Sequence, residues 1–138
     1  MIVSGYYALE RFVMIIITNN ASVHETYSET IKIEYLETAK FLEVLVHCRD
    51  RVHKGAKLLT HPLTGSIKPN ETPFKSIMMT EDIGPLDVDS LTMIESAIET
   101  TKKFLNNSEI KEWPERILND FRLIDFRLIR SAIETIGK

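Results

Sequence analysis

The sequence predicts an α/β protein, a three-layer sandwich with a mostly parallel sheet of about four strands and C-terminal helices. The first observation is the run from Phe12 to Ile17, which is continuously apolar and rich in β-branched residues, as in a strand covered on both faces. The second is that strand-like and helix-like segments alternate after it. The third is a helical pattern from about residue 88 onward.

Length and charge bound the class of protein. The chain of 138 residues is 43% apolar and 27% charged, which predicts a single domain over 1–138, with 1–11 as a possible loose N-terminal arm. Its 17 basic and 20 acidic residues are interspersed, so we expect no nucleic-acid or membrane partner. The apolar run is too short to cross a bilayer and no signal-peptide pattern precedes it, so a cytoplasmic location is expected.

Each element of the first half has a local signal. The first strand ends at Thr18, and Asn20 is placed to cap a short helix over 21–28. Apolar and polar residues alternate over 31–36, which indicates a half-exposed strand. A helix capped by Thr38 follows, and Gly55 ends it. Its apolar stripe consists of Phe41, Leu45, Cys48 and Val52.

A proline-rich loop follows a predicted third strand over 56–60. The loop spans 60–75, and a fourth strand over 75–80 comes after it. Loops of this length in compact domains are uncommon and tend to be functional. Because no helix joins the third and fourth strands, they could pair antiparallel or be joined by an unusual crossover.

The C-terminal part is predicted to be helical. Asp87 or Asp89 caps a helix that extends to about residue 105, and Pro114 suits the first turn of another. The tail contains the sequence DFRLI twice in succession, beginning at Asp120 and at Asp125. A five-residue repeat drifts by about 140° per copy on a helix. We therefore interpret Asp125 as a new cap, with one helix over 114–122 and another over 126–136.

The candidate site follows from the predicted topology. In open α/β sheets, ligands bind at the carboxyl ends of the strands, and the first and third strands would bring their polar ends together if they are neighbours. Hydroxyl, amide and ammonium groups at this point suit a small anion such as a carboxylate or phosphate. The same residue types are also common turn formers, which is the structural alternative. The predicted ligand-binding residues are Thr18, Asn19, Thr60, His61, Ser66, Lys68, Asn70 and Lys75.

Catalytic and metal-binding signals are weak. His61 precedes a proline and could act as a general acid or base, although a hydrogen-bonding anchor is the more ordinary role. His47 and His53 lie about 240° apart on a helix and cannot share a metal. The single cysteine, Cys48, excludes an internal disulfide and lies on an apolar stripe. We expect no metal and no cofactor, and no glycine-rich phosphate loop is present.

Four stretches of the chain resemble a known family: HKGAKLLTHPLTGSIKPNETPFKSIMM at 53–79, IIITNN at 15–20, SLTMIESAIETTKKFL at 90–105 and WPERILNDFRLID at 113–125. They resemble the GrdX family, small proteins encoded alongside glycine reductase in amino-acid-fermenting anaerobic bacteria. The resemblance implies an association with the glycine, sarcosine or betaine reductase system. It implies no particular reaction.

Three functions remain open from the sequence. The first is an accessory module that binds a small anion, such as an amino acid, phosphate or acetyl phosphate, or docks on a protein of the reductase system. The second is a small enzyme acting on a small anionic substrate, with His61 as acid or base. The third is a structural partner protein that uses its apolar tail, which could also form a homodimer through the C-terminal helices.

Overall fold

The computed structural model describes residues 14–63, 67–81, 83–107 and 111–136, so the predicted arm at 1–11 lies outside the described residues. Strands and helices alternate in the first half and two long helices end the chain, which confirms the α/β class. The elements are β1 (Met14–Thr18), α2 (Ala21–Tyr27), β2 (Lys32–Tyr35), α3 (Phe41–His53), β3 (Ser76–Thr80), α4 (Val88–Asn107) and α5 (Glu115–Ile136).

The sheet described here has three strands in the order β2-β1-β3. β1 pairs with β2 in parallel, with Ile16 opposite Ile33, and with β3 in antiparallel, with Ile16 opposite Met78. The prediction of a mostly parallel sheet is therefore wrong. The physical reason is the connection before β3: its described residues form no crossover helix, and β3 enters the sheet reversed.

The predicted third strand over 56–60 is also wrong. This segment makes a single bridge, between Leu58 and Met79, and lies outside β3. Backbone hydrogen bonds connect it to β3, including one of 2.8 Å from the Leu59 amide to the Met78 carbonyl. β3 therefore separates the segment from β1. The segment over 56–60 and β1 both run antiparallel to β3. Thr60 and Thr18, at the ends of these two segments, therefore lie at the same end of the sheet.

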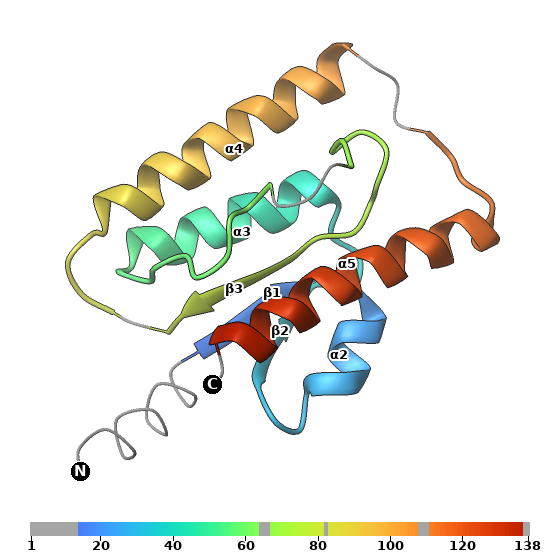
Figure 1. Cartoon of the computed structure of the whole chain (residues 1–138). Helices are drawn as coiled ribbons and strands as arrows, with labels where there is room; N and C mark the ends of the chain where they lie inside the picture. The colour runs from blue at the N-terminus through green and yellow to red at the C-terminus, as the bar shows by residue number, and fades with distance from the viewer. Residues whose placement is uncertain (1–13, 64–66, 82, 108–110, 137–138) are drawn as a thin grey trace.

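Helices lie on both sides of the sheet (Figure 1). Successive residues of β1 point to opposite faces, as the pleat of a strand requires. Ile15 and Ile17 join a core with buried residues of α3 and α4, whereas Ile16 joins a second core with Val23 of α2 and Ile129 of α5. α5 thus covers the face that the first pair of helices leaves open.

The helix ends follow from local chemistry, and the start of α3 departs from the prediction. Asn20 caps α2 as predicted, its side chain accepting from the Ser22 amide at 3.1 Å. α3 begins after Lys40, whose amide donates to the Glu43 carboxylate, and not after Thr38. Gly55 follows α3 with φ of 109°, a conformation that favours glycine.

The C-terminal tail is one continuous helix, so the predicted break at Asp125 is wrong. α5 runs for 22 residues, and Asp125 lies buried in its interior. A cap is not needed there, because partners from the sheet, described below, satisfy the carboxylate. Charged side chains recur along this helix and the 20-residue α4. Within the described ranges, no helix meets the requirements of a membrane span.

Candidate anion-binding site

Asn19 fixes the end of the long loop beside the carboxyl end of β1. Its side-chain amide donates to the carbonyls of Ala39, at 2.9 Å, and Pro73, at 2.8 Å. Its side-chain oxygen accepts from the Lys75 backbone amide at 2.9 Å. These three bonds use most of the capacity of the Asn19 side chain. Asn19 therefore holds the backbone that carries Lys75, and the side chain itself is 7% exposed.

Asp125 ties α5 to the ends of two strands. Its Oδ1 accepts from the Ser76 backbone amide at 3.0 Å, and its Oδ2 accepts from the Ser76 hydroxyl at 2.7 Å and the Asn20 amide at 3.0 Å. Since the Ser76 hydroxyl donates its one proton to Asp125, the 2.6 Å contact with Thr18 must be donated by Thr18. A directed chain thus runs from the Thr18 hydroxyl through Ser76 to the carboxylate.

Lys75 is a largely buried lysine whose ammonium lines a pocket and forms no ion pair with the described residues. The residue is 6% exposed. Its Nζ lies 5.9 Å from the centre of the Phe41 ring, and it makes no hydrogen bond or ion pair with any other of the described residues. Burial lowers the pKa of Lys75, and the Asp125 carboxylate acts in the opposite direction. Its three ammonium N–H groups thus have no acceptor among the described residues.

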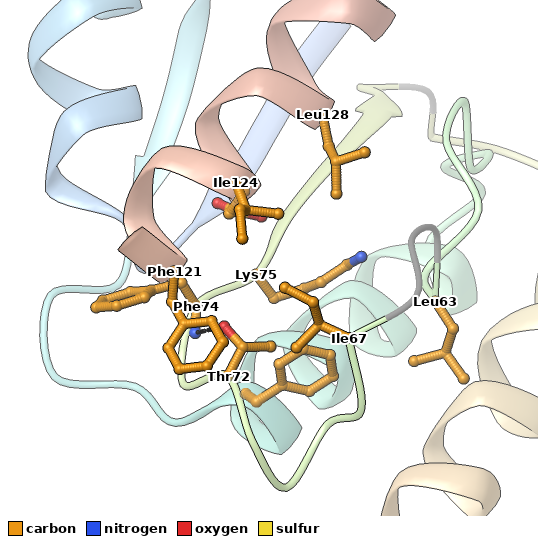
Figure 2. A pocket seen from close by; sticks show the side chains of 10 residues that line it. Leu63, Ile67, Thr72, Phe74, Lys75, Phe121, Ile124 and Leu128 are labelled. Carbon is orange, nitrogen blue, oxygen red and sulfur yellow. Dashed lines mark hydrogen bonds between the residues drawn. The ribbon is translucent and has the colours of Figure 1, made fainter. Parts of the chain in front are cut away.

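The Lys75 side chain lines a pocket of about 210 Å³ between the long loop and α5. Figure 2 shows it extending between Leu63 and Ile67 of the loop and Ile124 and Leu128 of α5. The remaining lining residues are Phe41, Thr72, Phe74, Phe121 and Asp125. The pocket, hereafter the Lys75 pocket, thus has mainly apolar walls around one cation.

Some of the predicted site residues support the pocket and do not line it. Thr18 and Asn19 lie behind Lys75 and are used up in holding strands and loop together. Thr60 serves the edge of the sheet, because its hydroxyl oxygen accepts from the Met78 amide at 3.0 Å. Of the predicted residues that the structure describes, Lys75 is the one that lines this pocket.

The other predicted residues lie elsewhere along the loop. His61 is exposed, and its ring Nδ1 accepts from the Leu63 amide at 3.0 Å, as a turn anchor would. Lys68 is exposed, and Asn70 is buried within a turn. Ser66 lies outside the described residues. The acid or base role of His61 stays a prediction.

Sequence reasoning missed Asp125 as a site residue and missed the aromatic walls. The available signal was an aspartate set among Ile124, Phe126 and Ile129 on a continuous helical pattern, since a buried carboxylate needs partners from elsewhere. Thr72 belongs to the polar residues of the predicted loop but was not among the predicted ligand-binding residues. Its hydroxyl accepts from the Phe74 amide at 3.2 Å and keeps its proton for another acceptor.

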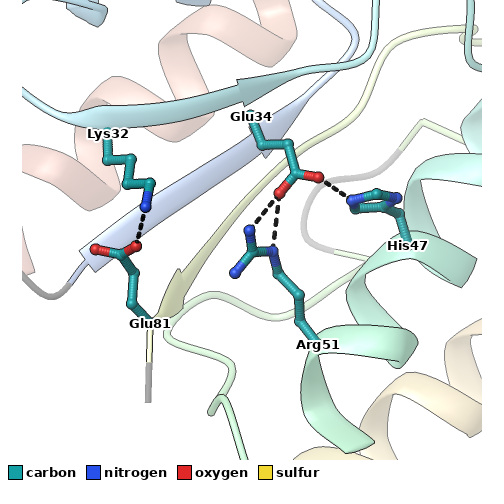
Figure 3. A network of polar contacts seen from close by, with 5 residues as sticks. All are labelled: Lys32, Glu34, His47, Arg51 and Glu81. Atoms are coloured by element: carbon teal, nitrogen blue, oxygen red, sulfur yellow. Dashed lines mark hydrogen bonds and ion pairs between the residues drawn. The ribbon is translucent and has the colours of Figure 1, made fainter. Parts of the chain in front are cut away.

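A second polar cluster joins β2 to α3 (Figure 3). Arg51 donates to Oε2 of Glu34 through two nitrogens, at 2.9 and 2.5 Å, and His47 contacts Oε1. Burial acts to raise the pKa of Glu34, but the bonds from Arg51 and His47 outweigh it and hold that pKa below its usual value. Lys32 pairs with Glu81 nearby. These charges satisfy one another, so we interpret the cluster as structural.

Neither metal nor thiol chemistry has a visible centre in the described part of the chain. No three of its His, Cys, Asp and Glu side chains gather at a metal-binding spacing. Cys48, on α3, is fully buried in the hydrophobic core, and this burial raises the pKa of the thiol. The Lys75 pocket therefore remains the best candidate.

Comparison with known proteins gives one match. The family model described as GrdX-like protein matches residues 15–134. This range includes every described residue that lines the Lys75 pocket. No curated protein and no solved structure matches the chain significantly.

Proposed function

Because the chain belongs to the GrdX-like family, we propose that it is an accessory protein of glycine reductase-type amino-acid fermentation that binds a small anion in the Lys75 pocket. The association with that system rests on the family resemblance. The binding activity rests on the site.

The observation that carries the proposal is the largely buried Lys75, whose ammonium lines the pocket and has no hydrogen-bond or ion-pair partner among the described residues. Keeping a cation 6% exposed without a partner costs free energy, which an incoming anion would recover. The Asp125 carboxylate does not supply this partner, because its oxygens already accept from Ser76 and Asn20. Three of the roughly four acceptor positions of this carboxylate are thus occupied, and Lys75 supplies the cation of the described lining, which favours an anionic ligand.

The test is a thermal-shift titration of the full chain with the anions phosphate and acetyl phosphate and with the zwitterions glycine and betaine, which carry a carboxylate. A ligand that binds only the folded state raises the melting temperature by mass action. We expect at least one anion to do so, and we expect Lys75→Met to abolish the shift while Lys68→Met, on the exposed part of the same loop, retains it.

Two results would contradict the proposal. One is the absence of any shift with a broad set of small anions. The other is a shift that persists undiminished in Lys75→Met, because the ligand would then be bound elsewhere. Circular dichroism of both variants establishes that they fold, so that a lost shift reports on binding.

The pathway association needs a separate measurement. Purified components of the reductase system, mixed with the chain, should bind it or have their activity altered by it if the accessory role includes docking. If the chain neither binds these components nor alters their activity, and anion binding is intact, the docking part of the proposal is wrong and metabolite binding alone remains.

A further inference from the structure

The free hydrogen-bond donors of the Lys75 pocket are few. The Lys75 ammonium and the Thr72 hydroxyl are the two polar groups of its described lining with protons to spare. A carboxylate, with two oxygens, can be satisfied by such a pair. Within the described lining, a phosphate, with more oxygens and more charge, would find fewer donors than it has acceptors.

The charge of the site also limits the ligand. Lys75 supplies one positive charge, and Asp125 already places a negative charge at the pocket wall. A monoanion neutralises the ammonium. Phosphate groups carry up to about two negative charges near neutral pH, so the second charge would find no cation in the described lining and would be repelled by Asp125.

The walls favour an apolar ligand body. Leu63, Ile67 and Phe74 face the pocket from the loop, and Ile124 and Leu128 face it from α5 (Figure 2). Apolar cavities of about 150 Å³ lined by such side chains accept benzene. The Lys75 pocket, at about 210 Å³, thus has room for a body of this size next to a carboxylate.

We infer that the Lys75 pocket takes monocarboxylates with a compact apolar body, such as an aromatic ring or a short branched alkyl chain, in preference to phosphate-type anions. The inference rests on the proposed anion binding and specifies its ligand class. The carboxylate contacts Lys75 and Thr72, and the apolar body lies against the loop and α5.

The experiment compares three probes by calorimetric titration of the full chain in chloride buffer at neutral pH. Benzoate and benzamide have nearly the same shape and differ in charge, whereas inorganic phosphate has charge without an apolar body. We expect benzoate to bind at least about tenfold more tightly than either of the others, because only benzoate uses both the ammonium and the walls.

Matched variants assign the effect to the pocket. Lys75→Met should reduce benzoate affinity about tenfold or more, to the level of benzamide, by removing a charge-assisted hydrogen bond. Lys68→Met, an exposed lysine of the same loop, should leave both affinities nearly unchanged. The wild-type comparison needs no variant, so the test holds even if one variant fails to fold.

The outcomes separate this inference from the proposed function. Phosphate binding more tightly than benzoate, with the binding lost in Lys75→Met, overturns the ligand class and leaves anion binding standing. Equal binding of benzoate and benzamide shows that charge is not recognised and overturns both. No binding of any probe, together with no shift from the small-anion set above, also overturns both.

Discussion

Asp125 shows how one buried carboxylate can organise a fold. It accepts hydrogen bonds from Ser76 and Asn20, so a residue of the last helix holds the ends of β1 and β3 together. Its twin in the tandem sequence, Asp120, is exposed. Two identical local sequences thus have different roles, because five residues rotate the side chain to another face of the helix.

We expect Asp125→Asn to lower the free energy of unfolding by about 2–4 kcal/mol. The substitution replaces one carboxylate oxygen, an acceptor, by an NH₂ group, a donor. This group would face the backbone amide of Ser76 or the side-chain amide of Asn20, so that a buried N–H would lose its acceptor. Urea denaturation measures the change. Asp120→Asn is the matched control, with an expected change within about 0.5 kcal/mol. Equal effects at the two positions would contradict the assigned role.

Lys75 is predicted to limit stability, as residues of binding sites often do. Its pKa is lowered in the folded state, so the unfolded chain binds more protons at alkaline pH below the ordinary lysine pKa. Stability should therefore rise with pH between the folded and unfolded pKa values of Lys75. Lys75→Met should raise the free energy of unfolding by about 1 kcal/mol at neutral pH and reduce that rise.

The same titration governs binding. An anion needs the charged form of Lys75, so affinity should fall as pH rises through the lowered pKa, earlier than for an ordinary lysine. Denaturation curves and ligand titrations between neutral pH and pH of about 10 measure both effects. Lys68→Met should follow the wild type. A destabilised Lys75→Met would contradict the assigned cost of burial.

At the scale of elements, periodicity predicted much of what is seen. The stripe of Phe41, Leu45, Cys48 and Val52 is buried throughout α3, and Asn20 caps α2. Such patterns are local, because the spacing of apolar residues along the sequence determines which face of a helix they occupy. The sequence also located the loop that carries Lys75, although most of the polar residues predicted with it turn out to be supports or surface.

What sequence missed depends on contacts between distant residues. Nothing local in the segment over 56–60 says whether it pairs with β1 or lies outside β3, because a strand's partner is set by tertiary packing. Asp125 resembled a cap because its partners, Ser76 and Asn20, come from another part of the chain. The walls contributed by α5 were hidden for the same reason.

The link between β2 and α3 gives a prediction at this scale. Glu34→Gln should weaken the contacts with Arg51 and His47 and lower stability by about 0.5–1.5 kcal/mol, since the side chain is partly exposed to solvent. The lowered pKa of Glu34 means that its contribution is present above the unfolded pKa and is lost as pH falls through the folded pKa.

Chemical denaturation between about pH 3 and pH 7 tests the Glu34 prediction. The difference between wild type and Glu34→Gln should shrink toward the acidic end. Glu43→Gln, at an exposed position of α3, can serve as a comparison only for general charge effects, since Glu43 accepts from the Lys40 amide. A constant difference at every pH would show that the Glu34 charge is not what stabilises this link.

At the scale of the whole molecule, α5 presents large apolar side chains to solvent: Leu123, Ile124, Leu128 and Ile136. The first three are between 38% and 46% exposed, and exposed apolar side chains often mark contacts between subunits. Leu123 lies near Ser22 and Thr26 of α2, whereas Ile124 and Leu128 line the Lys75 pocket. If the homodimer expected from the sequence covers Ile124 and Leu128, it would narrow the mouth of that pocket.

Sedimentation equilibrium over micromolar concentrations tests the homodimer. We expect reversible association that Leu123→Lys weakens, since a charge would be buried in an apolar contact. Thr92→Lys adds the same charge to an exposed position of α4 and should leave association unchanged. A monomer at all concentrations would rule out the homodimer.

The position of Asp125 and of the α5 pocket wall has one more consequence. The cavity exists only while the final helix is attached to the sheet, so occupancy and attachment are coupled equilibria. A bound molecule should therefore slow hydrogen exchange along residues 115–136 more than along α4, which contributes nothing to the lining described here. Detachment of α5 from the sheet would in turn release the bound ligand.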